Sequence, residues 1–278
     1  NEPISQWWDD IDATNVMQKE SKYYLAQNSG GEQAVFHINN PNEPVSKWWR
    51  TNLYNIKTGT SEYYIVEYLV NQKKALFHMD NPDKPVSQWW KSINISVLEG
   101  TPQYYIVKNQ DEKYAIFHID NPYEPISQWW DEIYEYGLTQ EKSEYYIACN
   151  SRKEQALFHK DDPYNPVSQW WHYICLLGCL KGNSPYYIAE NSSFKMAIFH
   201  IHDPYYPISN WYSYIYPFGL IDGTSECYAV MEHYTTPPIY IYHASDPTQP
   251  LYKLTDINKK ALLYFNDKFA IYLTNQNL

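Results

Sequence analysis

Adjacent aromatic residues recur along this chain in one short motif, as in PISQWW at 125–130, and the motif contains all eleven tryptophans. Neighbouring side chains of a strand point to opposite faces. We expect the first rings to pack between repeats: Trp7, Trp48, Trp89, Trp129, Trp170 and Trp211. We expect the second rings to be platforms for a sugar or a cation: Trp8, Trp49, Trp90, Trp130, Trp171 and Tyr212. The alternative is that both sets belong to the core.

Histidine is the second recurring residue type. Six of the nine histidines end a short apolar run, at steps of 40 to 43 residues: His37, His78, His118, His159, His200 and His243. We name these six as candidate ligand contacts. A metal site needs three or four such side chains within about 2.1 Å of one ion. Equivalent positions on separate repeats are too far apart for that, so no metal is expected.

Three pieces make up each repeat and must position these side chains. A Tyr-Tyr run such as EYYIAC (144–149) and an apolar run ending in histidine predict a β-hairpin, and a Pro-x-x-Pro segment leads into the tryptophans. The tryptophan segment is ambiguous. Val86, Trp89, Trp90, Ile93 and Val97 fit one face of a helix, whereas Pro217 and the alternation after Ile93 favour strands.

Four strands in about 41 residues match the size of a propeller blade. The run KALLYFNDKFAIYLTN (260–275) is a shortened last unit, with Tyr272 in the histidine position. We predict an all-β, seven-bladed β-propeller that forms one domain over residues 1–278. Residues 3–12 would pair with 269–273 and so close the ring. The alternative is an open ββα repeat array.

Composition excludes several classes of function. The net charge of −11 and the absence of a basic stretch argue against a nucleic-acid partner. No run of about eighteen apolar residues predicts a membrane span. The four cysteines do not follow the repeat, as a disulfide or zinc framework would. Phosphate loops and hydrolase motifs are absent, so we expect neither a cofactor nor an enzyme.

The repeats resemble those of bacterial seven-bladed β-propeller lectins and, more faintly, tectonin repeats. Phe117-His118, followed by Ser127, Trp129, Ile133 and Gly137, appears in the order that those families show. The chain differs in its low glycine content and in the Val or Ile before the serine. The resemblance implies the propeller fold. WD-type propellers also imply a hydrogen-bond network of histidine, serine and tryptophan, here His118, Ser127 and Trp129.

The leading functional hypothesis is a multivalent carbohydrate-binding protein, a lectin with one aromatic pocket per repeat. A protein-interaction propeller without sugar binding is the alternative, and the 30 tyrosines suit either function. A structural or toxin-associated subunit is a third. Expected partners are therefore glycans or a protein. The first residue is Asn, which indicates a processed chain. The sequence does not identify the compartment, although it favours secretion. It does not identify the oligomeric state either.

Overall fold

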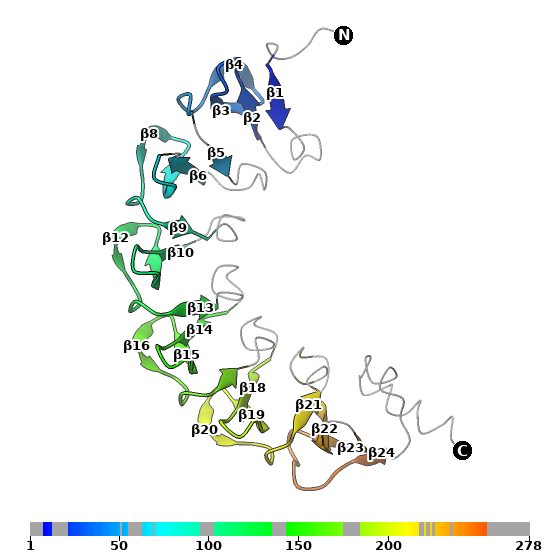
Figure 1. Cartoon of the computed structure of the whole chain (residues 1–278). Coiled ribbons are helices and arrows are strands. Elements are labelled where there is room, and N and C mark those ends of the chain that lie inside the picture. Colours follow the sequence, from blue (N-terminus) through cyan, green and yellow to red (C-terminus); the bar gives the residue numbers. More distant parts are fainter. Residues whose placement is uncertain are drawn as a thin grey trace, which may run out of the picture. The chain divides into compact units, whose positions relative to one another are not determined.

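The computed structural model describes residues 8–12, 22–50, 52–54, 63–68, 70–94, 103–134, 143–174, 184–216, 220, 223, 226–233 and 236–254. Every regular element in these ranges is a β-strand (Figure 1). The strands form six antiparallel sheets of four, and consecutive strands of the chain are neighbours in each sheet. The all-β prediction and the four strands per repeat are thereby confirmed over the described part of the chain.

The chain divides into two compact units, and the first, Asn1–Trp129, holds three sheets. Sheet A contains β1 (Asp10–Asp12), β2 (Tyr23–Gln27), β3 (Gln33–His37) and β4 (Asn40–Pro44). Sheet B contains β5 (Asn52–Tyr54), β6 (Tyr63–Tyr68), β7 (Lys73–His78) and β8 (Asn81–Pro85). Sheet C contains β9 (Ser92–Ile93), β10 (Tyr104–Lys108), β11 (Tyr114–His118) and β12 (Asn121–Pro125).

The second unit, Trp130–Leu278, holds the other three sheets. Sheet D contains β13 (Glu132–Tyr134), β14 (Tyr145–Cys149), β15 (Gln155–His159) and β16 (Asp162–Pro166). Sheet E contains β17 (Tyr173–Ile174), β18 (Tyr186–Glu190), β19 (Met196–His200) and β20 (Asp203–Pro207). Sheet F contains β21 (Tyr214–Tyr216), β22 (Cys227–His233), β23 (Thr236–His243) and β24 (Tyr252–Leu254).

The two middle strands of each sheet carry its core. In sheet D, Tyr146 lies opposite Phe158 and Ile147 lies opposite Leu157, and all four side chains are buried. Consecutive residues of a strand point to opposite faces. The run of buried residues therefore means that both faces of these strands are covered, which explains why the sequence shows continuous apolar runs rather than alternation.

The fourth strand is an edge strand that begins and ends near prolines. In sheet D, His159 pairs with Asp162 and Phe158 with Pro166, and the register shifts between the two pairs through a β-bulge. Proline has no N–H to donate and is therefore confined to sheet edges and bulges. The Pro-x-x-Pro spacing thus ends the sheet at this strand.

The hairpin between the second and third strands uses an asparagine-capped turn. Asn28 Oδ1 accepts hydrogen bonds from the N–H groups of Gly30 and Glu32, at 2.9 and 3.0 Å. Gly31 has a positive φ of 74°. Non-glycine residues take the same left-handed conformation in later repeats, at Glu112, Lys153 and Phe194. Such residues are strained, since a Cβ disfavours this region.

The tryptophan segment is neither a helix nor a full strand, and the fourth strand of sheets A to E is the Pro-x-x-Pro segment instead. Residues 86–91 form bends and a β-bridge before β9 begins. The helix that the ββα alternative requires is therefore missing from this described segment. Pairing of the chain ends and a seventh sheet fall largely outside the described residues. Closure, blade number and the single domain accordingly stay predictions.

Candidate functional site

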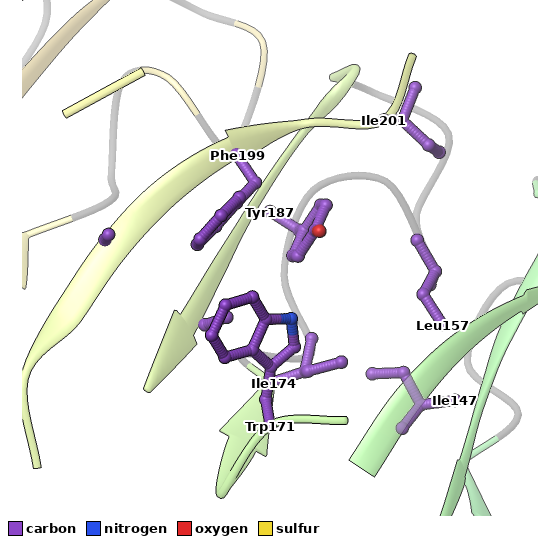
Figure 2. Packing of buried hydrophobic residues seen from close by; sticks show 9 residues of the cluster. Ile147, Leu157, Trp171, Ile174, Tyr187, Phe199 and Ile201 are labelled. Carbon is purple, nitrogen blue, oxygen red and sulfur yellow. The ribbon is translucent and has the colours of Figure 1, made fainter. Parts of the chain in front are cut away.

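The second ring of each aromatic pair joins two neighbouring sheets. Trp171 exchanges two backbone hydrogen bonds of 2.8 Å with Gln155 of sheet D. Its ring lies 4.9 Å from the ring of Phe199 in sheet E, measured between centroids. Figure 2 shows this indole beside Phe199, within the cluster that also contains Ile147 and Leu157 of sheet D. Backbone pairing with one sheet and ring packing on the next make this residue an inter-sheet link.

The same link recurs in the first unit. Trp49 bridges Gln33 of sheet A through its backbone and packs on Phe77 of sheet B at 5.2 Å. Trp90 repeats the arrangement one sheet later, between Lys74 and Phe117, at 5.1 Å. The Nε1 atoms of Trp90, Trp130 and Trp171 are buried without a hydrogen-bond partner in the described structure. Their contribution is therefore apolar packing.

The two rings differ in exposure in several repeats. Trp171 and Tyr212, both second rings, are 8% and 7% exposed, whereas the first rings Trp89, Trp129 and Trp211 are 36–38% exposed. The backbone bridge explains the burial of the second ring, because it turns that side chain toward the next sheet. The expected role of the second rings as ligand platforms stays a prediction. Trp48 and Trp170, both first rings, are half-buried. Trp8, Trp49, Trp90 and Trp130 are half-buried.

Each exposed first ring packs on a group of other aromatic rings. Trp129 lies 6.1 Å from Phe117 of its own sheet and 5.8 Å from Trp90, the second ring of the preceding pair. Tyr105 stacks on the other side of this group, 5.6 Å from Phe117. Equivalent groups occur around Phe36, Phe77, Phe158 and Phe199. The outer ring is consequently held in one orientation and presents part of its surface to solvent.

An exposed polar side chain precedes the first ring of the pair. It is an amide in most described repeats: Gln88, Gln128, Gln169 and Asn210. Gln88 Nε2 donates to the backbone oxygen of Tyr123 in the next sheet, at 3.4 Å. The sequence analysis missed these residues. The signal was present, because the position between serine and tryptophan is always Gln, Asn or Lys.

The recurring histidines belong to turns between the third and fourth strands. His118 Nδ1 accepts a hydrogen bond of 3.1 Å from the N–H of Asp120, and its ring lies edge-on to Tyr104 at 5.2 Å. Corresponding turn bonds are made by His37, His78, His159, His200 and His243. Burial and, secondarily, the nearby His202 lower the pKa of His200. An Nδ1 that accepts from the backbone belongs to a neutral imidazole with its proton on Nε2.

The expected network of histidine, serine and tryptophan is not formed. Ser127 Oγ accepts from the N–H of Ile116 at 2.9 Å and donates to the backbone oxygen of Gln128. His118 bonds within its turn instead. The two side chains therefore bond to different backbone groups and not to each other. Whether the six histidines also contact a ligand stays a prediction.

Further site types were sought in the described part of the chain. It contains no group of three or more His, Cys, Asp or Glu side chains that could hold a metal ion. Nor does it contain a helix long and apolar enough to cross a membrane.

Comparison with known proteins gives only distant likenesses. The chain matches no protein-family model and no curated protein sequence. It is similar to Hsv2 of Kluyveromyces lactis, at 8% identity and a TM-score of 0.36, over 90% of this chain and 76% of that one. It is also similar to the WD40 β-propeller domain of Doa1, at 8% identity and a TM-score of 0.28, over 85% of this chain and 80% of that one. TM-scores below 0.5 carry no argument, so the fold is inferred from the sheets themselves.

Proposed function

We propose that this chain is a multivalent binding module in which several repeats present an exposed tryptophan beside an exposed amide, and that the ligand is a carbohydrate. The supporting observation is the recurrence of this pair at one position of the repeat, as Gln88–Trp89, Gln128–Trp129 and Asn210–Trp211. The candidate platform is therefore the first ring rather than the second.

The chemistry of the pair suits a sugar. An indole offers a flat apolar face to the C–H groups of a pyranose ring. The neighbouring amide has two donor hydrogens and an acceptor oxygen, which can bond to hydroxyl groups on the same ring. Because Phe117 and Trp90 hold Trp129 from beneath, binding would cost little side-chain entropy.

Repetition converts weak single sites into strong attachment. Each pair offers a small contact area, so the affinity for a single sugar should be low. A surface that displays many copies of the ligand is bound more tightly, because each further contact becomes intramolecular. The proposed arrangement is the closed seven-bladed propeller, in which sheets A to F are six blades. Small-angle scattering from the full chain would distinguish a ring from an extended rod.

Titration with simple neutral sugars tests the proposal. We expect several equivalent weak sites per chain. Trp129→Ala should remove one of them while leaving the others unchanged, and Gln128→Ala should weaken the same site. Tyr206→Ala, a change at an exposed tyrosine outside the pair, is the matched control. Failure of every neutral sugar tested, or an unchanged number of sites in Trp129→Ala, would overturn it.

A protein partner is the second candidate function. Its supporting observation is a set of exposed tyrosines on β12, β16 and β20: Tyr123, Tyr164, Tyr205 and Tyr206. Tyrosine is enriched at protein interfaces. Binding of one protein at one-to-one stoichiometry, lost on Tyr164→Ala and unaffected by sugars, would favour this function over the first.

A further inference from the structure

The exposed tryptophan of sheet B has a second exposed ring beside it. Trp89 lies 6.1 Å from Tyr68, measured between ring centroids, and the two ring planes are inclined at 65°. Trp89 is 36% exposed and Tyr68 is 49% exposed. The other strongly exposed first rings, Trp129 and Trp211, contact rings that are buried or half-buried. Sheet B therefore presents a larger aromatic surface to solvent at its tryptophan.

Tyr68 stands where other repeats place a turn-capping residue. In sheets A, C, D and E, the residue after the second strand is an asparagine whose side chain caps the hairpin turn: Asn28, Asn109, Asn150 and Asn191. In sheet B the strand continues instead, so that β6 has six residues where β2 and β10 have five. Tyr68 pairs with Lys73, and the cap moves to Asn71, whose Oδ1 accepts from the N–H of Lys73 at 3.1 Å. The repeat is thus altered next to the exposed tryptophan.

Both rings lie on the face of sheet B that is turned toward sheet A. Trp89 also contacts Phe77 at 6.2 Å, and Phe77 belongs to a buried cluster with Val35 of sheet A. Tyr68 is two residues beyond Val66, another member of that cluster, and therefore shares its face of the strand. All of these residues belong to the first compact unit. The surface formed by the two rings lies within that unit.

The spacing of the two rings determines how a ligand can contact them. A sugar ring between two aromatic rings needs about 3.5–4.0 Å on each side. The 6.1 Å between Trp89 and Tyr68 leaves no space for that. The two rings consequently form one bent surface rather than a slot. Such a surface can contact two sugar rings in succession, one on each aromatic ring, because successive pyranose rings of a glycan are separated by a similar distance.

A lysine beside the rings distinguishes between ligand classes. Lys73 lies directly opposite Tyr68 in the register, and cross-strand partners share a face of the sheet. A cationic headgroup also stacks on aromatic rings, but the ammonium group of Lys73 would repel it. The same ammonium group has three donor hydrogens for the hydroxyl oxygens of a sugar. Charge therefore favours a sugar over a cation at this surface.

We propose that Trp89, Tyr68 and Lys73 bind two consecutive units of a neutral oligosaccharide, and that sheet B carries the tightest site of the chain. This inference rests on the proposed carbohydrate function and deepens it. One sugar ring stacks on Trp89, the next contacts Tyr68, and Lys73 donates to a hydroxyl group. The other repeats offer a single exposed ring and bind one unit at a time.

Calorimetric titration of the full chain with matched monosaccharides and disaccharides tests the proposal. Suitable pairs are glucose with cellobiose, N-acetylglucosamine with chitobiose, and mannose with mannobiose. For the sugar that binds, we expect similar sites for the monosaccharide. The disaccharide should show one site about three- to tenfold tighter than the others, which is the gain expected from one added aromatic contact.

Tyr68→Asn introduces the residue that four other sheets carry at this position. It should abolish the tighter disaccharide site and leave the number of monosaccharide sites unchanged. Tyr206→Asn, the same substitution at an exposed tyrosine of the second unit, is the matched control and should retain the tighter site. Lys73→Met is an independent variant that removes the donor and should weaken the tighter site alone.

The outcomes separate this inference from the function on which it rests. Several monosaccharide sites together with equal disaccharide sites would overturn the inference and leave the carbohydrate function standing. So would a tighter site that survives in a folded Tyr68→Asn chain or is unaffected in Lys73→Met. No binding of any monosaccharide or disaccharide would overturn both.

Discussion

Replacing Trp171 with alanine should destabilise the second unit much more than replacing Trp211. Both rings contact Phe199, at 4.9 and 6.0 Å between centroids. Trp171 is 8% exposed, within the cluster that joins sheets D and E (Figure 2), whereas Trp211 is 38% exposed. Truncation of a buried tryptophan costs about 3–5 kcal/mol, and we expect a loss in that range for Trp171→Ala.

The difference between the two variants follows from exposure and from cavity formation. A tryptophan side chain buries about 200 Å². The two rings differ by about 30% of that area, or roughly 60 Å², which corresponds to about 1.5 kcal/mol of transfer free energy. Truncating Trp171 also leaves an enclosed cavity between sheets, while solvent can fill the space of Trp211. The loss for Trp211→Ala should therefore be smaller by about 1.5 kcal/mol or more.

Urea unfolding of the full chain, followed by circular dichroism, measures these losses. The slope of free energy against urea should be the same in both variants, so that the midpoints report stability alone. Tyr206→Ala, at a more exposed aromatic residue, should change the free energy of unfolding by no more than about 0.5 kcal/mol. An equal or larger loss for Trp211→Ala than for Trp171→Ala would refute the assignment of the second ring as the inter-sheet link.

Three other outcomes are expected. Phe194→Gly should raise the melting temperature, because Phe194 has a φ of 58° at the position where Gly31 of the first repeat has a φ of 74°. The relief of about 1–2 kcal/mol of backbone strain exceeds the free-energy cost of the greater conformational entropy that glycine has in the unfolded chain. A lower melting temperature would contradict this. Ser127→Ala should cost about 1–3 kcal/mol, since it removes the partner of the buried Ile116 N–H; Ser151→Ala, in an exposed turn, is the control for the same urea measurement. Alkaline pH should destabilise the fold, because burial raises the pKa of five tyrosines above the usual value of about 10. The folded chain keeps these phenolic protons where the unfolded chain releases them, so this stability is present below about pH 10 and falls as the pH rises. Urea unfolding at a series of pH values checks this, and constant stability up to pH 11 would contradict it for Tyr64, Tyr105, Tyr146, Tyr212 and Tyr228.

Much of the strand structure could be predicted from local pattern. Runs such as YYIAC and QALFH are short, aromatic and β-branched, and both become middle strands of a sheet. Their continuous burial follows from the same pattern, since polar residues are confined to the ends of the runs. The edge strand was not predicted: the sequence favoured a strand at the tryptophans, whereas the structure places it at the paired prolines, as in β16.

The tryptophan segment shows where local pattern is insufficient. Two adjacent residues of an extended chain must face opposite sides, and this much was predicted for Trp170 and Trp171. Which side meets the next sheet depends on the backbone bridge from Trp171 to Gln155, a contact sixteen residues apart in the sequence. The alternation of side chains along an extended chain does not determine which of the two faces meets the next sheet. The sequence alone therefore could not assign the roles of the two rings.

The amino-acid sequence alone determined the repeat, its strands and turns, and the residue types available at each surface, because these follow from backbone sterics and local hydrogen bonding. Tertiary packing decided which tryptophan is buried in each pair and that His118 and Ser127 bond to separate backbone groups. Burial and cavity volume arise from contacts between sheets, and such contacts join residues that are distant along the chain.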